Sequence, residues 1–567
     1  MVKPIKIGAI AIGLGALLLS GVLWRGNATA PPDPERALVA SLRSEPTVYN
    51  RYLDGSAAAD LISLLTNATL VRVNRSTDAI EPALAERWAL SPDGLTYTLS
   101  LRHDVRFSDG APFTAADVLF TARVLFDTRV DSPLASTLRV DGKPLTFAAP
   151  DDFTVTVSLP SAFAPGLRLL DNMPILPRHK LEEALNAGSL REKARVGSTL
   201  DELAGLGPFK LVEHVAGQRL VFIRNPYYWR KDDHGRQLPY LDRLTVAILP
   251  DQNTEAVRLG AGEIDLMSNG DIRPDDYATF KRLSDEGRLK LMDAGIGLDP
   301  NFLWFNLTPQ GKVAPWLRDR CARQAISFAV DRQVMADTVY LGAAVPIYGP
   351  VSPGNKVWFS PSAPQYPHDA SRARELLAAA GLSDRDSDGM LEDAVGRPAR
   401  FSVMTQKGNT LRERGAAMIQ EHLRLIGISV DIVALDVRTL QTRWMSGDYE
   451  SIYMGAQASA TDPALNADFW LSSGPFHFWN PGQRVPATEW EARMDAMMRR
   501  QAAASALEER QQLFAGVQQI MGEELPAIYF VAPRVTIAVS PRVSNAAPVQ
   551  QAPQLLWSAD TLTVSGR

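Results

Sequence analysis

The clearest pattern of hydrophobic and polar positions lies between residues 80 and 126. Residues 96–102 alternate strictly between apolar and polar side chains, which predicts a half-buried strand. Turns are predicted on both sides of this strand, at Ser91-Pro92-Asp93-Gly94 and at Asp109-Gly110. The apolar face of the predicted strand consists of Tyr97, Leu99 and Leu101.

Helices are predicted at both ends of the same stretch. Glu81-Pro82 predicts a short helix through Trp88, because proline is tolerated at the first helical position. Thr114, followed three residues later by Asp117, predicts a capped helix and resembles a capping box with a shortened acid.

The rest of the chain alternates between strand-like and helix-like segments, which predicts an α/β protein. The βα alternation is clearest in residues 412–454. The principal predicted strands cover residues 37–42, 151–157, 209–212, 219–224, 244–249, 262–266, 301–307, 428–434, 449–454, 528–531 and 535–539. The predicted helices cover residues 253–259, 320–340, 412–425, 435–445 and 507–521.

The length of 567 residues changes this picture, because a single hydrophobic core stops growing at about 250 to 300 residues. At least two lobes are therefore expected. The net charge of −5 is small for a chain of this size and gives no indication of a nucleic-acid partner. The single cysteine, Cys321, excludes an intramolecular disulfide and a multi-cysteine metal site.

The first 30 residues have the features of an export signal. Lys3 and Lys6 precede an apolar run over residues 7–24, and Ala28-Thr29-Ala30 is a plausible cleavage site. The run is just long enough to span a bilayer, so residues 1–30 are either a cleaved signal peptide or a retained anchor to the inner membrane. We favour cleavage and a soluble periplasmic protein.

Several motifs stand in a fixed order along the chain. They are IEPALAERW, SPDGLTYTLSLR, VRFSDGAPFTAADV, GLGPFKLVEHVAGQRLVFIRNPYYW, AGEIDLM and RQAISFAVDRQVM, followed by a late Asp-Pro turn. In this order the motifs resemble the peptide- and nickel-binding group of bacterial extracellular solute-binding proteins (family 5), the receptors of ATP-driven importers. The resemblance covers roughly residues 40 to 545.

This resemblance implies a two-lobed type II periplasmic-binding-protein fold with an extra subdomain in the first lobe. It also implies a monomer that binds a peptide or another small solute between the lobes and delivers it to an ABC permease in the inner membrane, without a cofactor. The expected division is lobe I at 37–50, 176–295 and 528–567, an inserted subdomain at 51–175, and lobe II at 296–527.

Five candidate ligand neighbours lie near the starts of the two expected lobes, three in the first lobe and two in the second. By resemblance, the turn after the first strand lies at the rim of the cleft, which makes Glu45, Tyr49 and Asn50 candidates; shaping the turn is the alternative role. Trp304 and Asn306 share one face of a strand near the expected crossing between lobes, where they could line the cleft or lie in the core.

Four more candidates lie where the chain departs from the family. Peptide-binding members place an acid three residues before the Asp-Pro pair, and this chain has Ser459 there. Members that clamp a terminal carboxylate use an arginine where Gln406 stands, beside Lys407. Asp462 could pair with an ammonium group, but capping the turn before Pro463 is its more common role.

The sequence gives less support to other functions. Asp384, Asp386 and Asp388 resemble the first half of a calcium loop, yet the twelfth position is Val395, so we favour a solvated acidic loop and predict no metal site. An exported hydrolase is disfavoured, because the seven histidines are dispersed and neither GxSxG nor HExxH occurs. An oligosaccharide or a metal chelate remains an alternative ligand for the same receptor fold.

Overall fold

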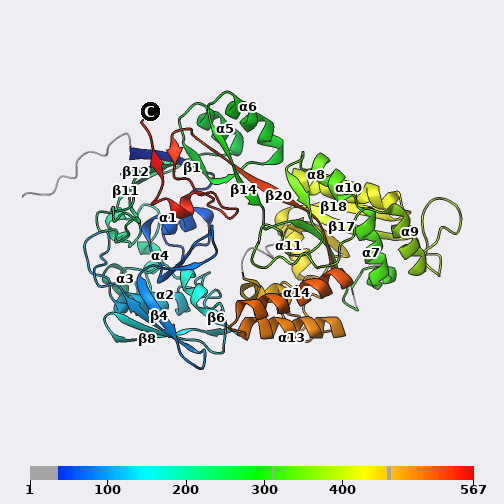
Figure 1. Ribbon diagram of the computed structural model, residues 1–567, viewed down its shortest axis with the longest axis horizontal. Helices are drawn as coiled ribbons and strands as arrows, with labels where there is room; N and C mark the ends of the chain where they lie inside the picture. Colours follow the sequence, from blue (N-terminus) through cyan, green and yellow to red (C-terminus); the bar gives the residue numbers. More distant parts are fainter. Residues whose placement is uncertain (1–35, 310, 456–461, 567) are drawn as a thin grey trace, which may run out of the picture.

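The computed structural model describes residues 36–309, 311–455 and 462–566 (Figure 1). The chain forms two lobes that lie side by side and are bridged by strand β20, Ala527–Val539. Within the described ranges, no helix combines the length and the hydrophobicity needed to cross a bilayer.

A mixed sheet of twelve strands runs through both lobes. The α/β class predicted from the sequence is confirmed. The order along the main path is β10 (Phe209–Val215), β11 (Arg219–Arg224), β12 (Arg243–Ile248), β1 (Ala37–Leu42), β13 (Leu266–Asp271), β20, β15 (Asn301–Phe305), β19 (Ser451–Gly455), β17 (Arg400–Gln406) and β18 (Ser429–Leu435), with β14 (Lys290–Ile296) and β16 (Ala344–Pro346) also paired to β20.

Strand β20 belongs to both lobes. Its first part pairs with β15, from Trp304 opposite Ala527 to Asn301 opposite Val531. Its last part pairs with β14, from Ile296 opposite Arg534 to Lys290 opposite Val539. The sequence predicted two separate strands here, and that prediction is wrong: Pro533 lies where β20 changes partners, so its missing N–H does not end the strand.

A separate four-stranded sheet lies within residues 51–175, the range expected for the inserted subdomain. Its order is β4 (Ala85–Leu90), β5 (Thr96–Leu101), β9 (Thr154–Ser158) and β8 (Thr146–Asp151). The predicted strand at 96–102 is confirmed, and Tyr97, Leu99 and Leu101 are buried. The exact boundaries of subdomain and lobes stay a prediction.

The predicted helix from Glu81 to Trp88 is wrong. Ile80–Pro82 is the short strand β3, and β4 pairs antiparallel with β5, so that Trp88 lies opposite Leu99. The turn at Ser91–Gly94 makes β4 and β5 a hairpin, and the backbone hydrogen bonds of this hairpin override the local helix preference. The helix after Thr114 is confirmed as α2 (Ala115–Phe126), and the Asp117 carboxylate accepts the Thr114 N–H at 3.0 Å.

The predicted helix at 320–340 is two helices, α7 (Arg320–Ala329) and α8 (Arg332–Thr338). The Asp331 carboxylate accepts hydrogen bonds from the N–H groups of Gln333 and Val334, which starts a new helix and ends the continuous one. Further helices are α1 (Ala57–Thr66), α3 (Arg178–Asn186), α4 (Leu190–Lys193), α5 (Gln252–Gly260), α6 (Tyr277–Asp285), α9 (Ala370–Ala379), α10 (Thr410–Arg424), α11 (Val437–Met445), α12 (Ala467–Trp470), α13 (Glu489–Ala503) and α14 (Leu507–Glu524).

The two lobes also touch away from β20. The Ala164 N–H, from the subdomain, donates to the Ala502 carbonyl at the end of α13 at 2.7 Å. At the opposite edge, Arg414 of α10 forms an ion pair of 2.8 Å with Asp275, which precedes α6. The lobes therefore lie close together in this conformation.

A fully buried carboxylate organises the loop before α13. Glu491 accepts hydrogen bonds from His477 at 3.0 Å and from Asn480 at 2.6 Å. Its second oxygen accepts the N–H groups of Ala487 and Thr488. Burial alone would raise the pKa of Glu491, but the hydrogen bonds from His477 and Asn480 outweigh it and hold the pKa at about 2.

This network predicts a pH-dependent stability. Because the folded pKa of Glu491 lies below the unfolded value of about 4.3, its contribution is complete above pH 5 and is lost as the pH falls toward 2. At pH 7 we expect Glu491→Gln to lower the free energy of unfolding by roughly 3 kcal/mol. The difference from wild type, measured by urea unfolding, should shrink at pH 3. Glu489→Gln, an exposed change in the same helical turn, is the control; an equal loss there would contradict the prediction.

Candidate functional site

Three adjoining cavities lie between and beside the lobes, and Arg75 lines all of them. The largest, about 600 Å³, has walls from both lobes. Asp271, at the end of β13, and Gln554 belong to the first lobe, whereas Asp462 and Leu465 belong to the second. Pro533 and Val535 of β20 and the segment 297–299 complete the wall, so the cavity adjoins the strand that joins the lobes.

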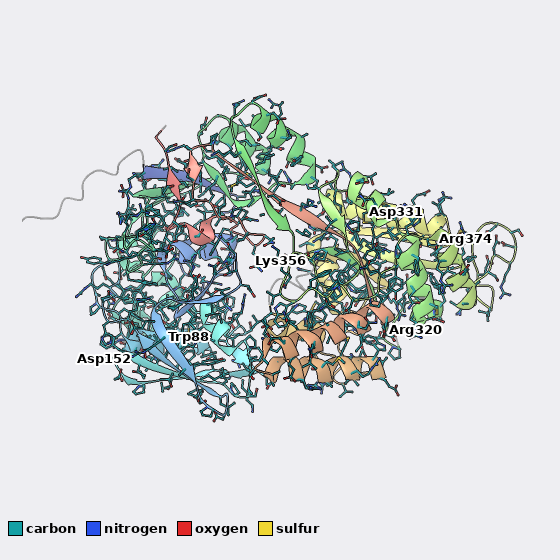
Figure 2. All side chains as sticks on the ribbon, in the orientation of Figure 1. Trp88, Asp152, Arg320, Asp331, Lys356 and Arg374 are labelled. Carbon is teal, nitrogen blue, oxygen red and sulfur yellow. The ribbon has the colours of Figure 1, made fainter. Side chains whose placement is uncertain are left out.

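A second cavity of about 190 Å³ lies beside the first. One wall is the turn at 75–78 with Arg168, and the other is the segment 354–357. Figure 2 shows Lys356 near the middle of the molecule, between the two lobes. Gln550 lines both this cavity and the largest one, so the two are parts of one cleft.

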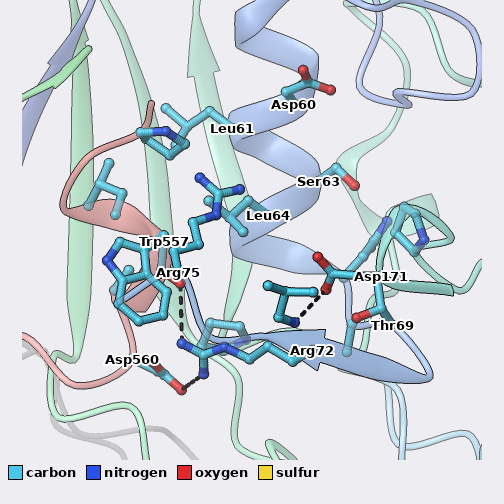
Figure 3. Close-up of a pocket in the computed structure, with 18 of the residues that line it drawn as sticks. Asp60, Leu61, Ser63, Leu64, Thr69, Arg72, Arg75, Asp171, Trp557 and Asp560 are labelled. Atoms are coloured by element: carbon cyan, nitrogen blue, oxygen red, sulfur yellow. Dashed lines mark hydrogen bonds and ion pairs between the residues drawn. The ribbon is translucent and has the colours of Figure 1, made fainter. Parts of the chain in front are cut away.

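The third cavity, about 330 Å³, extends from the cleft into the first lobe (Figure 3). One wall is helix α1, which contributes Leu61 and Leu64, and another is the segment that carries Trp557. The short strand β2 (Val71–Val73) contributes Arg72. We refer to this cavity as the first-lobe pocket.

Several charged groups in the first-lobe pocket are partly shielded from solvent. Burial lowers the pKa of Arg75, with the charges of Asp171 and Arg72 as smaller influences. Burial likewise raises the pKa of Asp171, although the Val73 N–H donates to its carboxylate at 3.1 Å. Water is partly excluded from both the cation and the anion, so charges in this pocket are less screened than in bulk solvent. An ionic group of a ligand would therefore interact strongly here.

Asp462 lies at the edge of the largest cavity but is buried and already paired. Its carboxylate accepts the Ala464 N–H at 3.0 Å and caps the short 3₁₀ helix Pro463–Asn466. One of its oxygens lies 2.6 Å from Arg510, which is equally buried. The turn-capping role expected for Asp462 is therefore present, and a buried ion pair is added to it.

Two of the three candidates near the first turn, Glu45 and Tyr49, are joined in a hydrogen-bond chain through His214. Glu45 lies 2.7 Å from His214 Nε2, and Tyr49 Oη lies 2.8 Å from His214 Nδ1. Glu45 also accepts the Gly217 N–H, which ties the turn to the β10–β11 hairpin. Asn50 is buried and accepts the Tyr52 N–H. In this conformation all three side chains hold the turn in place.

Trp304 and Asn306 lie in the second lobe, and both are buried. Trp304 packs among aromatic rings, 5.0 Å from Phe302 and 4.9 Å from Phe478 between ring centroids. Asn306 donates to the Gly447 carbonyl at 2.9 Å and accepts from Thr308. Their side chains are thus part of the core, the alternative considered from the sequence.

Gln406 ends β17, and its side-chain oxygen accepts a hydrogen bond from Arg412. Arg412 also donates to Asn301 at 3.1 Å, which links the starts of α10 and β15. Lys407 is exposed, with its backbone N–H bonded to Leu435. Ser459 lies outside the described residues. The eight described candidates therefore do not form one cluster, and among them only Asp462 lines one of the three cavities.

The acidic loop does bring its carboxylates together. Oxygens of Asp384, Asp386 and Asp388 lie within 4.8 Å of one another, on exposed side chains. Glu392, further along the same loop, accepts the Arg385 N–H at 2.9 Å. This contact is typical of a surface loop that is held by hydrogen bonds among its own residues.

Arg75 is the residue that sequence reasoning missed. It stands in the turn Asn74–Asp78, where an arginine has no distinguishing pattern. The segment 549–554 that faces it is almost 500 residues away along the chain. Only the folded chain brings them together, so no local signal could have identified this site.

The family is established by comparison with known proteins. The model of bacterial extracellular solute-binding proteins, family 5, matches residues 79–478, more than half of the chain. The chain belongs to this family of substrate-binding receptors, as its motifs predicted.

Curated relatives are similar along most of their length. The oligopeptide-binding protein AppA of Bacillus subtilis is 28% identical over 75% of this chain and 74% of its own. The heme-binding protein A of Haemophilus influenzae is 27% identical over 84% of this chain and 83% of its own.

Solved structures share the fold, and with the family match they confirm the type II periplasmic-binding-protein fold predicted from the sequence. AppA from Bacillus subtilis in complex with a nonapeptide matches with a TM-score of 0.68 and 24% identity, over 94% of this chain and all of that one. NikA from Brucella suis in complex with Fe(III)-EDTA matches with a TM-score of 0.73 and 24% identity, over 93% of this chain and 99% of that one.

The Asp462–Arg510 pair gives a test of what Asp462 does. Replacing Asp462 with asparagine leaves the Arg510 cation buried without its counter-charge, so we expect Asp462→Asn to lower the free energy of unfolding by about 3 kcal/mol. Asp468→Asn, an exposed change in α12, should leave it unchanged. Thermal and urea unfolding measure both. A normal melting temperature together with lost ligand affinity would instead assign Asp462 to ligand binding.

Proposed function

We propose that the protein is the substrate-binding component of an ABC importer, which captures an oligopeptide or peptide-like solute between its lobes and delivers it to a membrane permease. One observation carries this proposal: the cavity of about 600 Å³ has walls from both lobes and from the strand that joins them. A volume of this size suits a ligand of several residues or a comparable small molecule.

The peptide class is supported by the relatives. An oligopeptide-binding protein is 28% identical over three quarters of this chain. The heme-binding relative shows that the family also serves ligands of other chemistry, so an oligosaccharide or a metal chelate is the alternative.

The arrangement of the cleft supports closure around the ligand. A ligand in the largest cavity would touch Gln554 on one side and Leu465 on the other, and it makes both sets of contacts only when the lobes are close. Ligand binding then favours the closed conformation by the difference in contacts. The permease would distinguish loaded from empty receptor by the relative position of the lobes.

The export features of residues 1–30 support a periplasmic receptor in this proposal. It would be a soluble monomer after cleavage, or would be held at the inner membrane by the uncleaved segment. Its partner there is the permease. No step of this function requires a cofactor.

The proposal predicts that the purified receptor carries a peptide. Native mass spectrometry before and after mild denaturation should release a peptide or peptide-like solute. If the preparation is empty, thermal-shift assays with a peptide library should raise the melting temperature. A released sugar or metal chelate, or no shift with any peptide, would contradict the peptide class.

The ion pair between Asp462 and Arg510 predicts how strongly the receptor depends on the amino terminus of a bound peptide. Because Arg510 already neutralises the Asp462 carboxylate and Ser459 stands at the position of the usual acid, neither of these two positions offers a free carboxylate to a terminal ammonium. N-acetylation of a bound peptide should change its affinity less than about threefold, and free di- and tripeptides should bind poorly. Isothermal titration measures both. Micromolar binding of unmodified tripeptides would overturn this expectation.

A further inference from the structure

Arg75 is held in a defined position by the turn that carries it. The Asn74 carbonyl accepts the Asp78 N–H at 2.7 Å, and the Asn74 side chain accepts the Ser76 N–H at 2.9 Å. From this turn the Arg75 side chain reaches into the first-lobe pocket, where Figure 3 shows its guanidinium between α1 and the segment of Trp557. One of its nitrogens donates to the Ala552 carbonyl at 2.9 Å.

The other arginines of this pocket have carboxylate partners. Arg51 lies 3.1 Å from Asp60, and Arg230 lies 2.5 Å from Asp560. Arg72 lies 4.0 Å from the same Asp560. Among the described residues, no carboxylate lies within ion-pair distance of Arg75, so its charge is balanced only at longer range.

The walls around Arg75 combine apolar and polar side chains. Leu61 and Leu64 of α1 line one side, and Trp557 lines the other, with Arg72 stacked 5.1 Å from the centre of its ring. A ligand group that fits here would have an apolar stem and an anionic end. A carboxylate on a short chain has this form, and a guanidinium binds it through two parallel hydrogen bonds.

We propose that Arg75 binds a carboxylate of the ligand and makes the receptor selective for acidic solutes. The ligand lies in the cleft and directs either an acidic side chain or its terminal carboxylate into the first-lobe pocket. This inference rests on the proposed peptide-receptor function and adds the chemical class of the ligand. Arg75 also lines both other cavities, so a ligand anywhere in the cleft passes close to it.

The desolvation of Arg75 strengthens the proposal. Burial lowers its pKa, which means that the charged form lacks part of its hydration in the empty pocket. A bound carboxylate would replace that hydration with a direct ion pair. The smaller charge effects on Arg75 come from Asp171 and Asp60, which favour the cation, and from Arg72 and Arg51, which disfavour it.

Matched peptide pairs test this assignment. Each peptide of four to nine residues is prepared with glutamate and with glutamine at the same position, and with a free and an amidated carboxyl terminus. In isothermal titration, wild type should bind the acidic peptide at least tenfold more tightly than the neutral peptide in one of these two kinds of pair. The reason is that the neutral peptide leaves the Arg75 cation without a partner. The pair type that shows the difference identifies the source of the carboxylate.

Variants of Arg75 complete the test. Arg75→Gln should abolish the preference and Arg75→Lys should retain part of it, both with a normal melting temperature. Arg87→Gln, an exposed change on β4, should leave the preference intact. Equal binding of acidic and neutral members by wild type would overturn the role of Arg75 and leave the peptide receptor standing. Binding of no peptide at all would overturn both.

Discussion

The structure depends on one strand whose backbone is hydrogen-bonded to both lobes. Strand β20 pairs with β15 over its first residues and with β14 over its last. The chain between β14 and β15, residues 297–300, crosses beside it, and the Gly297 N–H donates to the Pro533 carbonyl at 2.7 Å. The lobes are therefore joined by two adjacent crossings tied to each other. Their relative movement must be absorbed by the backbone torsions of these few residues, because the paired segments on either side are rigid.

The same crossings form part of the ligand cleft. Gly297, Pro533 and Val535 line the largest cavity together with residues of both lobes. A ligand in that cavity touches the segments that must bend. Ligand binding is therefore coupled directly to the relative position of the lobes, and no other part of the molecule has to transmit the change. Among the described residues, the lining of the first-lobe pocket includes none of Gly297, Pro533 and Val535, and Arg75 lies where this pocket adjoins the largest cavity. Selection of the ligand and response to it thus belong to neighbouring but different parts of one cleft.

Much of the fold could be predicted from local patterns. Ala37–Leu42 and Thr96–Leu101 are strands as their apolar positions indicated, and Thr114 begins a helix. The errors occur where distant pairing decides: Ala85–Leu90 is a strand because β5 pairs with it, and Asp331 divides a helix through its own side chain. The candidate site was harder to predict from the sequence than the fold. Glu45 and Tyr49 lie in a hydrogen-bond chain through His214, and Arg75 contacts the segment 549–554. Both contacts join residues far apart in the sequence, so no local pattern could predict them.

The late position of β20 in the sequence has a consequence for how the protein is made. Val539 lies opposite Leu266 and Lys290, and Ala527 lies opposite Trp304, so these pairings join residues more than two hundred positions apart. During synthesis, all but about the last 40 residues of the chain emerge before this strand is available. Neither lobe can complete its sheet earlier, although their helices and hairpins can form. The two lobes therefore finish folding together, after translation of nearly the whole chain, rather than one after the other.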